Sequence, residues 1–464
     1  MNDKTQFIKN LLAAFLAQGI SLLASVFISF IIPKFLGVKE YGYWQLFIFY
    51  IGYVGFFHFG FNDGLYLRLG GKKFEELEYD IIGTQFKLFF LIEFFICIFV
   101  VFIASFVAVD SERKFVWIAT GVYLLLNNLT LCLGYLFQAI NETRIFSISS
   151  ILDRVFVLAS IFFLLWQRQN SFVPFVMGYT LSRFVSCVYC IWMARRIVFS
   201  KLVSIRIALA EMWLNVSTGI KLMAANIMSM LILGIGRVII DRLWGIESFG
   251  KISFSLSLAN FFLLFIQQVS MVLFPALRRT EESQQKKIYN KIRVYLGLFL
   301  PAVFIAYFPL KLFVGWWLPQ YSESLKYLAL LLPLCTFDGK MQMLCNTYLK
   351  VLRQEKKLLQ FNVYAFVISL GLCSFSGYVL HSLTGIVISM VLAIMFRSIV
   401  SELFLAKEIG IQILGLMIQE VFMVLAFLGS IWFFHEAIAF GFTVLAYGIY
   451  LFLNRKSVKY SGEM

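Results

Sequence analysis

Residues 31–42 read IIPKFLGVKEYG, and a related stretch, IIDRLWGIESFG, follows at residues 239–250. Both isoleucines and both glycines match between the two stretches. Three further positions hold conservative pairs: Lys34/Arg242, Val38/Ile246 and Tyr41/Phe249. Each stretch follows one long apolar run and precedes another. This equivalent placement indicates an internal duplication that produced two parallel repeats.

The composition predicts a membrane protein. Of the 464 residues, 61% are hydrophobic and only 14% are charged, whereas soluble domains are about 45–50% apolar and about 25% charged. One soluble core cannot bury so much apolar surface. The aromatic content of 18% excludes a disordered chain, and the length excludes a small secreted disulfide scaffold.

Apolar runs bounded by charged residues, proline or glycine predict about 14 transmembrane helices, because about 20 helical residues cross a bilayer. The predicted spans lie near residues 10–32, 42–61, 81–109, 115–139, 146–167, 172–194, 218–240, 251–274, 292–314, 325–349, 358–380, 383–406, 413–434 and 436–453. We expect an all-α polytopic fold in which the repeat relates two parallel halves. The expected domains are an N-terminal lobe at 1–195, a basic cytoplasmic inter-lobe segment at 196–217, a C-terminal lobe at 218–406, and spans 13 and 14 with a basic cytoplasmic tail at 407–464.

Basic residues are distributed unevenly among the predicted loops. Most of the 40 lysines and arginines fall on the side of the bilayer that holds the N-terminal residues, and the positive-inside rule makes that side cytoplasmic. Both termini are therefore predicted to be cytoplasmic. The net charge of +15 is then mainly a topology signal with some attraction for anionic lipid headgroups, and nucleic acid is not an expected partner.

The seven cysteines all lie in apolar runs, where a free thiol behaves as a small hydrophobe. Cys187 and Cys190 form a CxxC pair, but no further Cys or His cluster lies near them in the sequence. We therefore predict no metal site and no cofactor.

Several stretches resemble one family of bacterial membrane proteins. KNLLAAFLAQGISLLASVFISFIIPKFLGVKEYGYWQLFIFY (9–50), FGFNDGLYLRLGGK (59–72), the second repeat (239–250) and FPALRRTEESQQKK (274–287) together resemble Wzx-type polysaccharide transporters. These belong to the multidrug/oligosaccharidyl-lipid/polysaccharide exporter (MOP) superfamily. The resemblance runs in order over nearly the whole chain. It implies two pseudo-symmetric six-helix lobes around a central cavity, with two further C-terminal helices.

The same resemblance implies a function. Members of the family turn undecaprenyl-diphosphate-linked oligosaccharide repeat units across the bacterial cytoplasmic (inner) membrane. The repeat units then enter O-antigen, capsule or exopolysaccharide assembly, so the implied partners are the lipid-linked oligosaccharide, the lipid bilayer, and polysaccharide polymerase and assembly proteins.

A diphosphate that crosses an apolar slab needs cationic side chains, because an unpaired charge there is costly. Five basic residues within the predicted spans are candidates to bind it: Arg154, Arg183, Arg237, Lys340 and Arg397. Arg183 and Arg397 are favoured, since each lies in the sixth span of its half. The alternative for Arg183 is a structural bridge to Asp153, which lies at a similar depth on the preceding span.

Acidic residues at depth are candidates for coupling transport to H⁺ or Na⁺. These are Glu93, Asp338 and Asp153. Glu93 and Asp338 have no obvious partner nearby in the sequence, which makes them the first choices. Each carboxyl group is equally well explained as a hydrogen-bonded structural acid.

Uncharged polar residues recur at helical spacing within some spans. Ser253, Ser257, Asn260 and Gln267 advance by 4, 3 and 7 positions, which places them on one helix face; Asn127, Asn128 and Gln18 are further candidates. Such residues either face the sugar in the lumen or hold helices together.

The sequence thus predicts a non-enzymatic flippase that works by alternating access of a cationic cavity. A multidrug exporter of the same superfamily is one rival, although an acidic cavity would suit it better. A lipid II flippase also fits 14 spans. A membrane glycosyltransferase or polymerase is the rival from another class, and it would need paired acids or a long outer loop.

Overall fold

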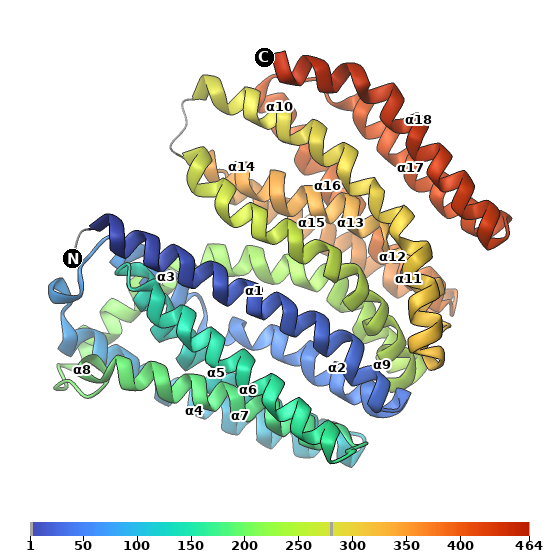
Figure 1. Ribbon diagram of the computed structural model, residues 1–464. Coiled ribbons are helices and arrows are strands. Elements are labelled where there is room, and N and C mark those ends of the chain that lie inside the picture. The colour runs from blue at the N-terminus through green and yellow to red at the C-terminus, as the bar shows by residue number, and fades with distance from the viewer. Residues whose placement is uncertain (1–2, 279–281, 464) are drawn as a thin grey trace. The chain divides into compact units, whose positions relative to one another are not determined.

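The computed structural model describes residues 3–278 and 282–463, and within them the side chains of residues 16–264, 266, 277 and 284–455. In these ranges the chain forms helices and short helical turns, and no strand (Figure 1). Two compact units, Met1–Ile227 and Met228–Met464, divide the chain.

The first unit contains ten helical elements and the first part of an eleventh. They are α1 (Asp3–Phe35), α2 (Val38–Tyr53), η1 (Val54–His58), α3 (Phe61–Leu69), η2 (Phe74–Glu76), α4 (Tyr79–Val107), α5 (Ser111–Ala139), α6 (Thr143–Trp166), α7 (Phe172–Met193), α8 (Arg195–Val198) and the start of α9 (Ile205–Arg278). Its core includes Phe61, Phe89, Leu133 and Phe137, which join α3, α4 and α5.

The second unit contains the end of α9 and the remaining helices. They are α10 (Glu282–Phe299), η3 (Leu300–Ala302), α11 (Val303–Trp317), η4 (Pro319–Tyr321), α12 (Ser324–Leu331), α13 (Pro333–Lys340), the π-helical turn η5 (Met341–Cys345), α14 (Asn346–Val351), α15 (Glu355–Ser374), the π-helical turn η6 (Phe375–Val379), α16 (Leu383–Ile409), α17 (Leu414–Phe433) and α18 (Glu436–Glu463). The last two helices, α17 and α18, pack against each other (Figure 1).

The helices are long and apolar enough to account for the predicted spans. Among the described residues, twelve helical stretches could each cross a membrane, and the bent pair of Val38–His58 and Phe61–Leu69 makes a thirteenth. One of the twelve belongs to α9, whose 74 residues would extend about 110 Å if straight. A kink at Gly245 divides α9 into two arms, each longer than the roughly 20 residues that a span requires. The predicted all-α polytopic fold is confirmed.

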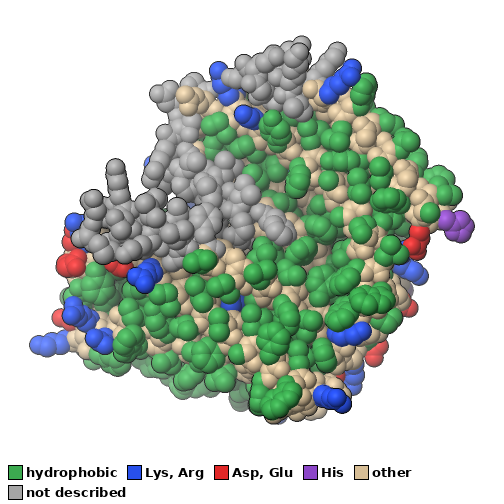
Figure 2. Space-filling view, in the orientation of Figure 1, with side chains coloured by type: hydrophobic (Ala, Val, Ile, Leu, Met, Phe, Trp, Pro, Cys, Tyr) green, Lys and Arg blue, Asp and Glu red, His purple; other side chains and the backbone are tan. Residues whose placement is uncertain are grey.

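The helix surfaces facing outward are apolar. On α4, Phe95, Phe99, Phe102 and Phe106 are each more than half exposed, with Phe106 at 74%. Figure 2 shows hydrophobic side chains over much of the visible described surface. Exposed apolar surface of this extent is typical of helices that face lipid or another protein.

The links between the described helices are short. Residues 108–110 join α4 to α5, 167–171 join α6 to α7, and 434–435 join α17 to α18. Residues 318–323, between α11 and α12, include the turn η4. Almost all side chains in the described part of the chain therefore belong to helices.

The two related stretches of the sequence occupy equivalent breaks in the backbone. Gly37 lies between α1 and α2 in an extended conformation (φ −61°, ψ 163°). Gly245, the matching glycine, has φ 76° and ψ −177° at the kink in α9, a conformation that only glycine adopts readily. Both copies thus use a glycine to end one helix and begin the next.

Glycines also allow α3 to approach the first part of α9 within the first unit. A Cβ atom at Gly64 would overlap the backbone carbonyl of Asn215, and one at Gly219 would overlap the carbonyl of Gly60. Gly60 itself has φ +81° and caps the start of α3. The stretch FGFNDGLYLRLGGK therefore includes a glycine contact surface between two helices, where small residues let backbones approach closely.

We expect Gly64→Ala to destabilise the protein by about 2–3 kcal/mol or more, because an added methyl group would force two backbones apart. The measurement is the thermal unfolding of the detergent-purified protein. Gly429→Ala on α17 is the matched control, since no atom lies within 4 Å of its Cβ position, and this variant should be neutral or slightly stabilised. Equal stability of the two variants would contradict the close contact.

Candidate functional site

Two arginines, one carboxylate and two tyrosines form a cluster in the first unit, called here the arginine–tyrosine cluster (Arg154, Arg183, Asp153, Tyr123 and Tyr179). Arg183 on α7 forms an ion pair with Asp153 on α6, with 3.4 Å between Nη2 and Oδ2. Its Nε and Nη2 also donate to the Tyr123 hydroxyl at 3.2 and 3.0 Å. The bridge to Asp153, one of the two alternatives for Arg183, is thus present.

Arg154 adds a second positive charge to the same cluster. Its Nη1 donates to the hydroxyl of Tyr179 at 3.3 Å. Tyr179 in turn packs against Trp44 and Phe47, with ring centroids 5.7 and 6.0 Å apart. The cluster therefore holds two guanidinium groups and one carboxylate among aromatic rings, with a net charge of +1.

A second polar group in the first unit, called here the Glu93 cluster, consists of Glu93, Asn62, Asn127 and Asn128. Glu93 on α4 is fully buried, and its Oε2 accepts from Nδ2 of Asn128 on α5 at 3.0 Å. The same Nδ2 donates to the carbonyl of Val54 at 3.0 Å. Asn127 donates to Oδ1 of Asn128 at 3.3 Å. Asn128 thus contacts a predicted coupling acid directly, and Asn127 is linked to that acid through Asn128.

Arg397 and Asp338 form an ion pair in the second unit, between α16 and α13. Arg397 also donates from Nη1 to the Ser229 hydroxyl at 2.5 Å, and Gln342 donates to the other carboxylate oxygen of Asp338 at 2.5 Å. Asp338 therefore has a basic partner 59 residues away in sequence, which its sequence neighbourhood did not indicate.

The largest charged group in the second unit is a buried charge network of Arg293, Lys340, Glu402 and Glu420. Arg293 contacts both carboxylates, Glu420 at 2.6 Å. Lys340 also contacts both, Glu402 at 3.0 Å. All four side chains are at most 1% exposed. With two cations and two anions, the network is neutral and joins α10, α13, α16 and α17.

The remaining predicted site residues differ in their burial and in their contacts. Arg237 donates to the hydroxyl of buried Ser253 at 2.8 Å and lies over the Phe249 ring. Ser257 is half-buried and donates to the backbone carbonyl of Ser253, whereas Asn260 is exposed. Gln18 on α1 is half-buried. The side chain of Gln267 lies outside the described residues.

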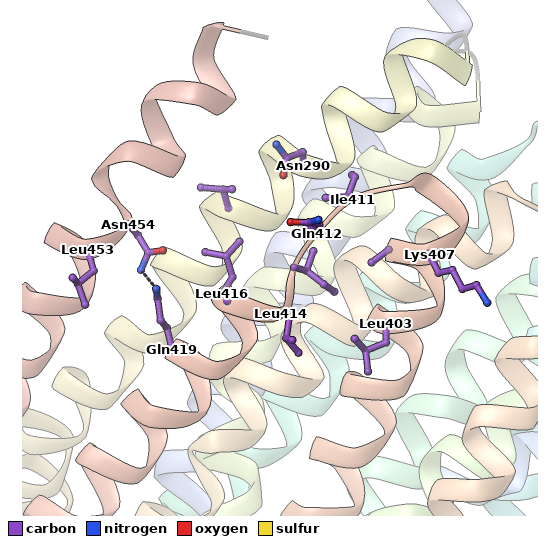
Figure 3. A pocket seen from close by; sticks show the side chains of 14 residues that line it. Asn290, Leu403, Lys407, Ile411, Gln412, Leu414, Leu416, Gln419, Leu453 and Asn454 are labelled. Carbon is purple, nitrogen blue, oxygen red and sulfur yellow. Dashed lines mark hydrogen bonds between the residues drawn. The ribbon is translucent and has the colours of Figure 1, made fainter.

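A cavity of about 810 Å³ lies at one end of α10, α16, α17 and α18 in the second unit. Four amide side chains line it, together with Lys407 and a wall of leucines (Figure 3). The amides are those of Asn290, Gln412, Gln419 and Asn454, and Asn454 donates to Gln419 at 2.6 Å. None of the predicted site residues belongs to its lining.

Within the described residues, no group of three or more His, Cys, Asp or Glu side chains could hold a metal ion. Cys187 and Cys190 are both buried and free. Cys190 donates to the Ser149 hydroxyl at 3.2 Å, as a structural thiol does.

A family model described as polysaccharide biosynthesis protein matches residues 7–281 of the sequence, which is more than half of the chain. The chain belongs to this polysaccharide biosynthesis protein family. The resemblance to polysaccharide transporters is thereby confirmed. No curated protein sequence matches the chain.

Solved structures place this member of the polysaccharide biosynthesis protein family in the MOP fold. An inward-facing multidrug resistance MATE family transporter of the MOP superfamily is 13% identical, with a TM-score of 0.65 over 87% of this chain and 98% of that one. The lipid II flippase MurJ, in an inward closed conformation, is 14% identical, with a TM-score of 0.66 over 97% and 99%. A MOP superfamily transporter from Pyrococcus furiosus is 12% identical, with a TM-score of 0.51 over 88% and 96%. The protein is a multi-pass membrane protein with the fold of these transporters.

Sequence reasoning missed two charged residues of this polysaccharide biosynthesis family member. Glu402 lies within the predicted span 383–406 but was not among the acids considered, and Arg293, at the start of the predicted span 292–314, was counted with the loops. Both are fully buried. An inspection of every charge within two turns of a span end would have found them.

Proposed function

We propose that this protein is a flippase for undecaprenyl-diphosphate-linked oligosaccharide repeat units in O-antigen, capsule or exopolysaccharide biosynthesis. It would act in the bacterial cytoplasmic membrane, with both termini cytoplasmic. Translocation would proceed by alternating access, in which a cationic cavity opens first to one side of the membrane and then to the other, without covalent chemistry. Polysaccharide polymerase and assembly proteins would then receive the repeat unit.

The observation that carries the proposal is the excess positive charge of the arginine–tyrosine cluster. Asp153 forms an ion pair with Arg183, whereas the hydrogen bond of Arg154 within the described part of the chain goes to the neutral hydroxyl of Tyr179. A diphosphate bound there would complete the charge balance through charge-assisted hydrogen bonds, which guanidinium groups form in pairs with phosphate oxygens. The surrounding aromatic rings and hydroxyls suit a sugar, since ligand sites combine apolar walls with a few placed polar groups.

Arg397 is the corresponding candidate in the second unit. It occupies the sixth span of its repeat, as Arg183 does, and each arginine has a carboxylate partner. The buried Nε of Arg397 has no hydrogen-bond partner among the described residues, so it retains a donor for an anion. Lys340 already contacts two carboxylates, and the proposal gives it a structural role.

The same features weigh against two rivals. A cationic cluster disfavours cationic drugs as substrates. Glycosyl transfer or polymerisation would need paired acids or a long outer loop. Asp153, Asp338, Glu402 and Glu420 are instead paired with basic side chains, and Glu93 lies buried against the neutral amide of Asn128. A lipid II flippase remains the nearest alternative, because lipid II presents the same diphosphate.

A deletion strain separates these functions. We expect loss of surface polysaccharide together with accumulation of lipid-linked repeat units on the cytoplasmic leaflet, and recovery of both when the gene is returned. Rescue of a strain depleted of its lipid II flippase would instead favour lipid II. Normal polysaccharide with increased dye or drug sensitivity would contradict the proposal and favour multidrug export.

A further inference from the structure

Glu93 differs from the other buried acids in that no described side chain forms an ion pair with it. Asp153, Asp338, Glu402 and Glu420 each contact an arginine or lysine. Glu93 is fully buried, and its one hydrogen bond among the described residues comes from the neutral amide of Asn128. A carboxylate buried in this way is strongly disfavoured unless a cation or proton neutralises it.

The hydrogen bonds around Asn128 determine which way its amide points. Its Oδ1 accepts from Asn127, so its Nδ2 is the atom that donates to Val54 and to Glu93. Both hydrogens of Nδ2 are then in use. The amide supplies one donor to Oε2 of Glu93 and has none left for Oε1.

Two buried acceptors in the Glu93 cluster lack a donor. Oε1 of Glu93 and Oδ1 of Asn62 have no hydrogen-bond partner among the described residues. Asn62 belongs to the same cluster because its Nδ2 donates to the backbone carbonyl of Asn128 at 3.5 Å. One proton on Oε1 would remove the charge and turn an unsatisfied acceptor into a donor.

The described titratable groups around the Glu93 cluster do not neutralise a charge on Glu93. Cys97 on α4 and Cys132 on α5 are buried thiols on Glu93's own helix and on the facing helix. On η1 and α3, His58 and Asp63 lie 3.8 Å from each other, and His58 Nδ1 accepts from the Gly60 amide.

Basic side chains on α3 and α4 have other partners. Lys87 donates to the carbonyl of Ser200, and Arg68 on α3 pairs with Glu211. Arg195 and Arg196 belong to α8, which packs beside Gly83 of α4, about 15 Å along the helix from Glu93.

We propose that Glu93 is the proton-binding residue through which this flippase is coupled to the proton gradient. This inference rests on the proposed function for its coupling role, but not for proton binding itself. A proton fits better than Na⁺, because a sodium ion is held by several oxygen ligands, whereas the Asn128 amide directs an N–H group, and not its oxygen, toward the carboxylate. Loss of the proton would leave an unpaired charge, so deprotonation favours a conformation that exposes Glu93 to water.

Infrared spectroscopy of the purified protein tests proton binding without any substrate. At neutral pH the wild type should show the C=O stretching band of a protonated carboxyl group, which disappears at alkaline pH. Glu93→Gln should lack this band, whereas the exposed-acid control Glu323→Gln should keep it. A band unchanged in Glu93→Gln, or one that Na⁺ removes at constant pH, would overturn the proposal.

The deletion strain tests coupling separately. Glu93→Gln should reach the membrane at wild-type level but lose at least tenfold of the surface polysaccharide, and Glu93→Asp should restore part of it. Full polysaccharide in Glu93→Gln would refute the coupling role. If the infrared result holds while the wild-type gene has no effect on polysaccharide, the proposed function fails and the proton site stands.

Discussion

Arg183→Ala is expected to reduce surface polysaccharide at least about tenfold, because the proposed function gives its guanidinium group a hydrogen bond to the diphosphate, and hydrogen bonds to charged groups contribute about 1.5–3 kcal/mol each. Arg183→Lys should restore part of the activity, since the charge survives without the planar fork. The measurement is polysaccharide in the complemented deletion strain, normalised to the amount of protein in the membrane.

The same experiment extends to the second unit. Arg397→Ala should have a similar effect, and the double variant should produce no polysaccharide. Arg242→Ala is the matched control because Arg242 is exposed, and it should behave as wild type. Normal polysaccharide in the double variant would exclude these arginines as diphosphate ligands.

Lys340→Met is expected to destabilise the second unit by about 3–5 kcal/mol, because removing one partner of a buried ion pair leaves an uncompensated charge. Glu402 and Glu420 would then share Arg293 as their one basic partner in the network. The variant should unfold at a lower temperature in detergent and reach the membrane in smaller amounts.

A second substitution separates a structural role of Lys340 from a binding role. Lys340→Met combined with Glu420→Gln removes one charge of each sign, so much of the lost stability should return. Substrate binding by Lys340 would give a different result, in which the single variant keeps its stability but loses polysaccharide. That outcome would return Lys340 to the diphosphate site.

The fold was accessible from the sequence because the membrane imposes a simple rule on each span. An apolar run of about 20 residues has to be a helix there, so α5, α7 and α17 could be placed without knowledge of their neighbours. Gly245 was recognisable through its match with Gly37. That α9 would continue from residue 205 to residue 278 with a kink at Gly245 was less visible, since helix boundaries depend on local capping.

The candidate site was only partly accessible. Comparison of depths on adjacent spans was enough to suggest the Asp153–Arg183 bridge. The pairing of Asp338 with Arg397, and of Lys340 with Glu402 and Glu420, depends on how distant helices rotate and pack. Periodicity places a charge on a helix face, but it does not reveal which helix that face will meet.

The shortness of the links between helices bears on how substrate preference could be changed. In the described part of the chain, links such as residues 108–110, 167–171 and 434–435 join long helices, and links this short offer few side chains to contact a sugar. Discrimination between repeat units would then reside in helix-borne side chains. Grafting linkers between homologues should leave the accepted glycan unchanged, and engineering of new glycan selectivity should begin with libraries at helical positions such as Tyr123 and Tyr179.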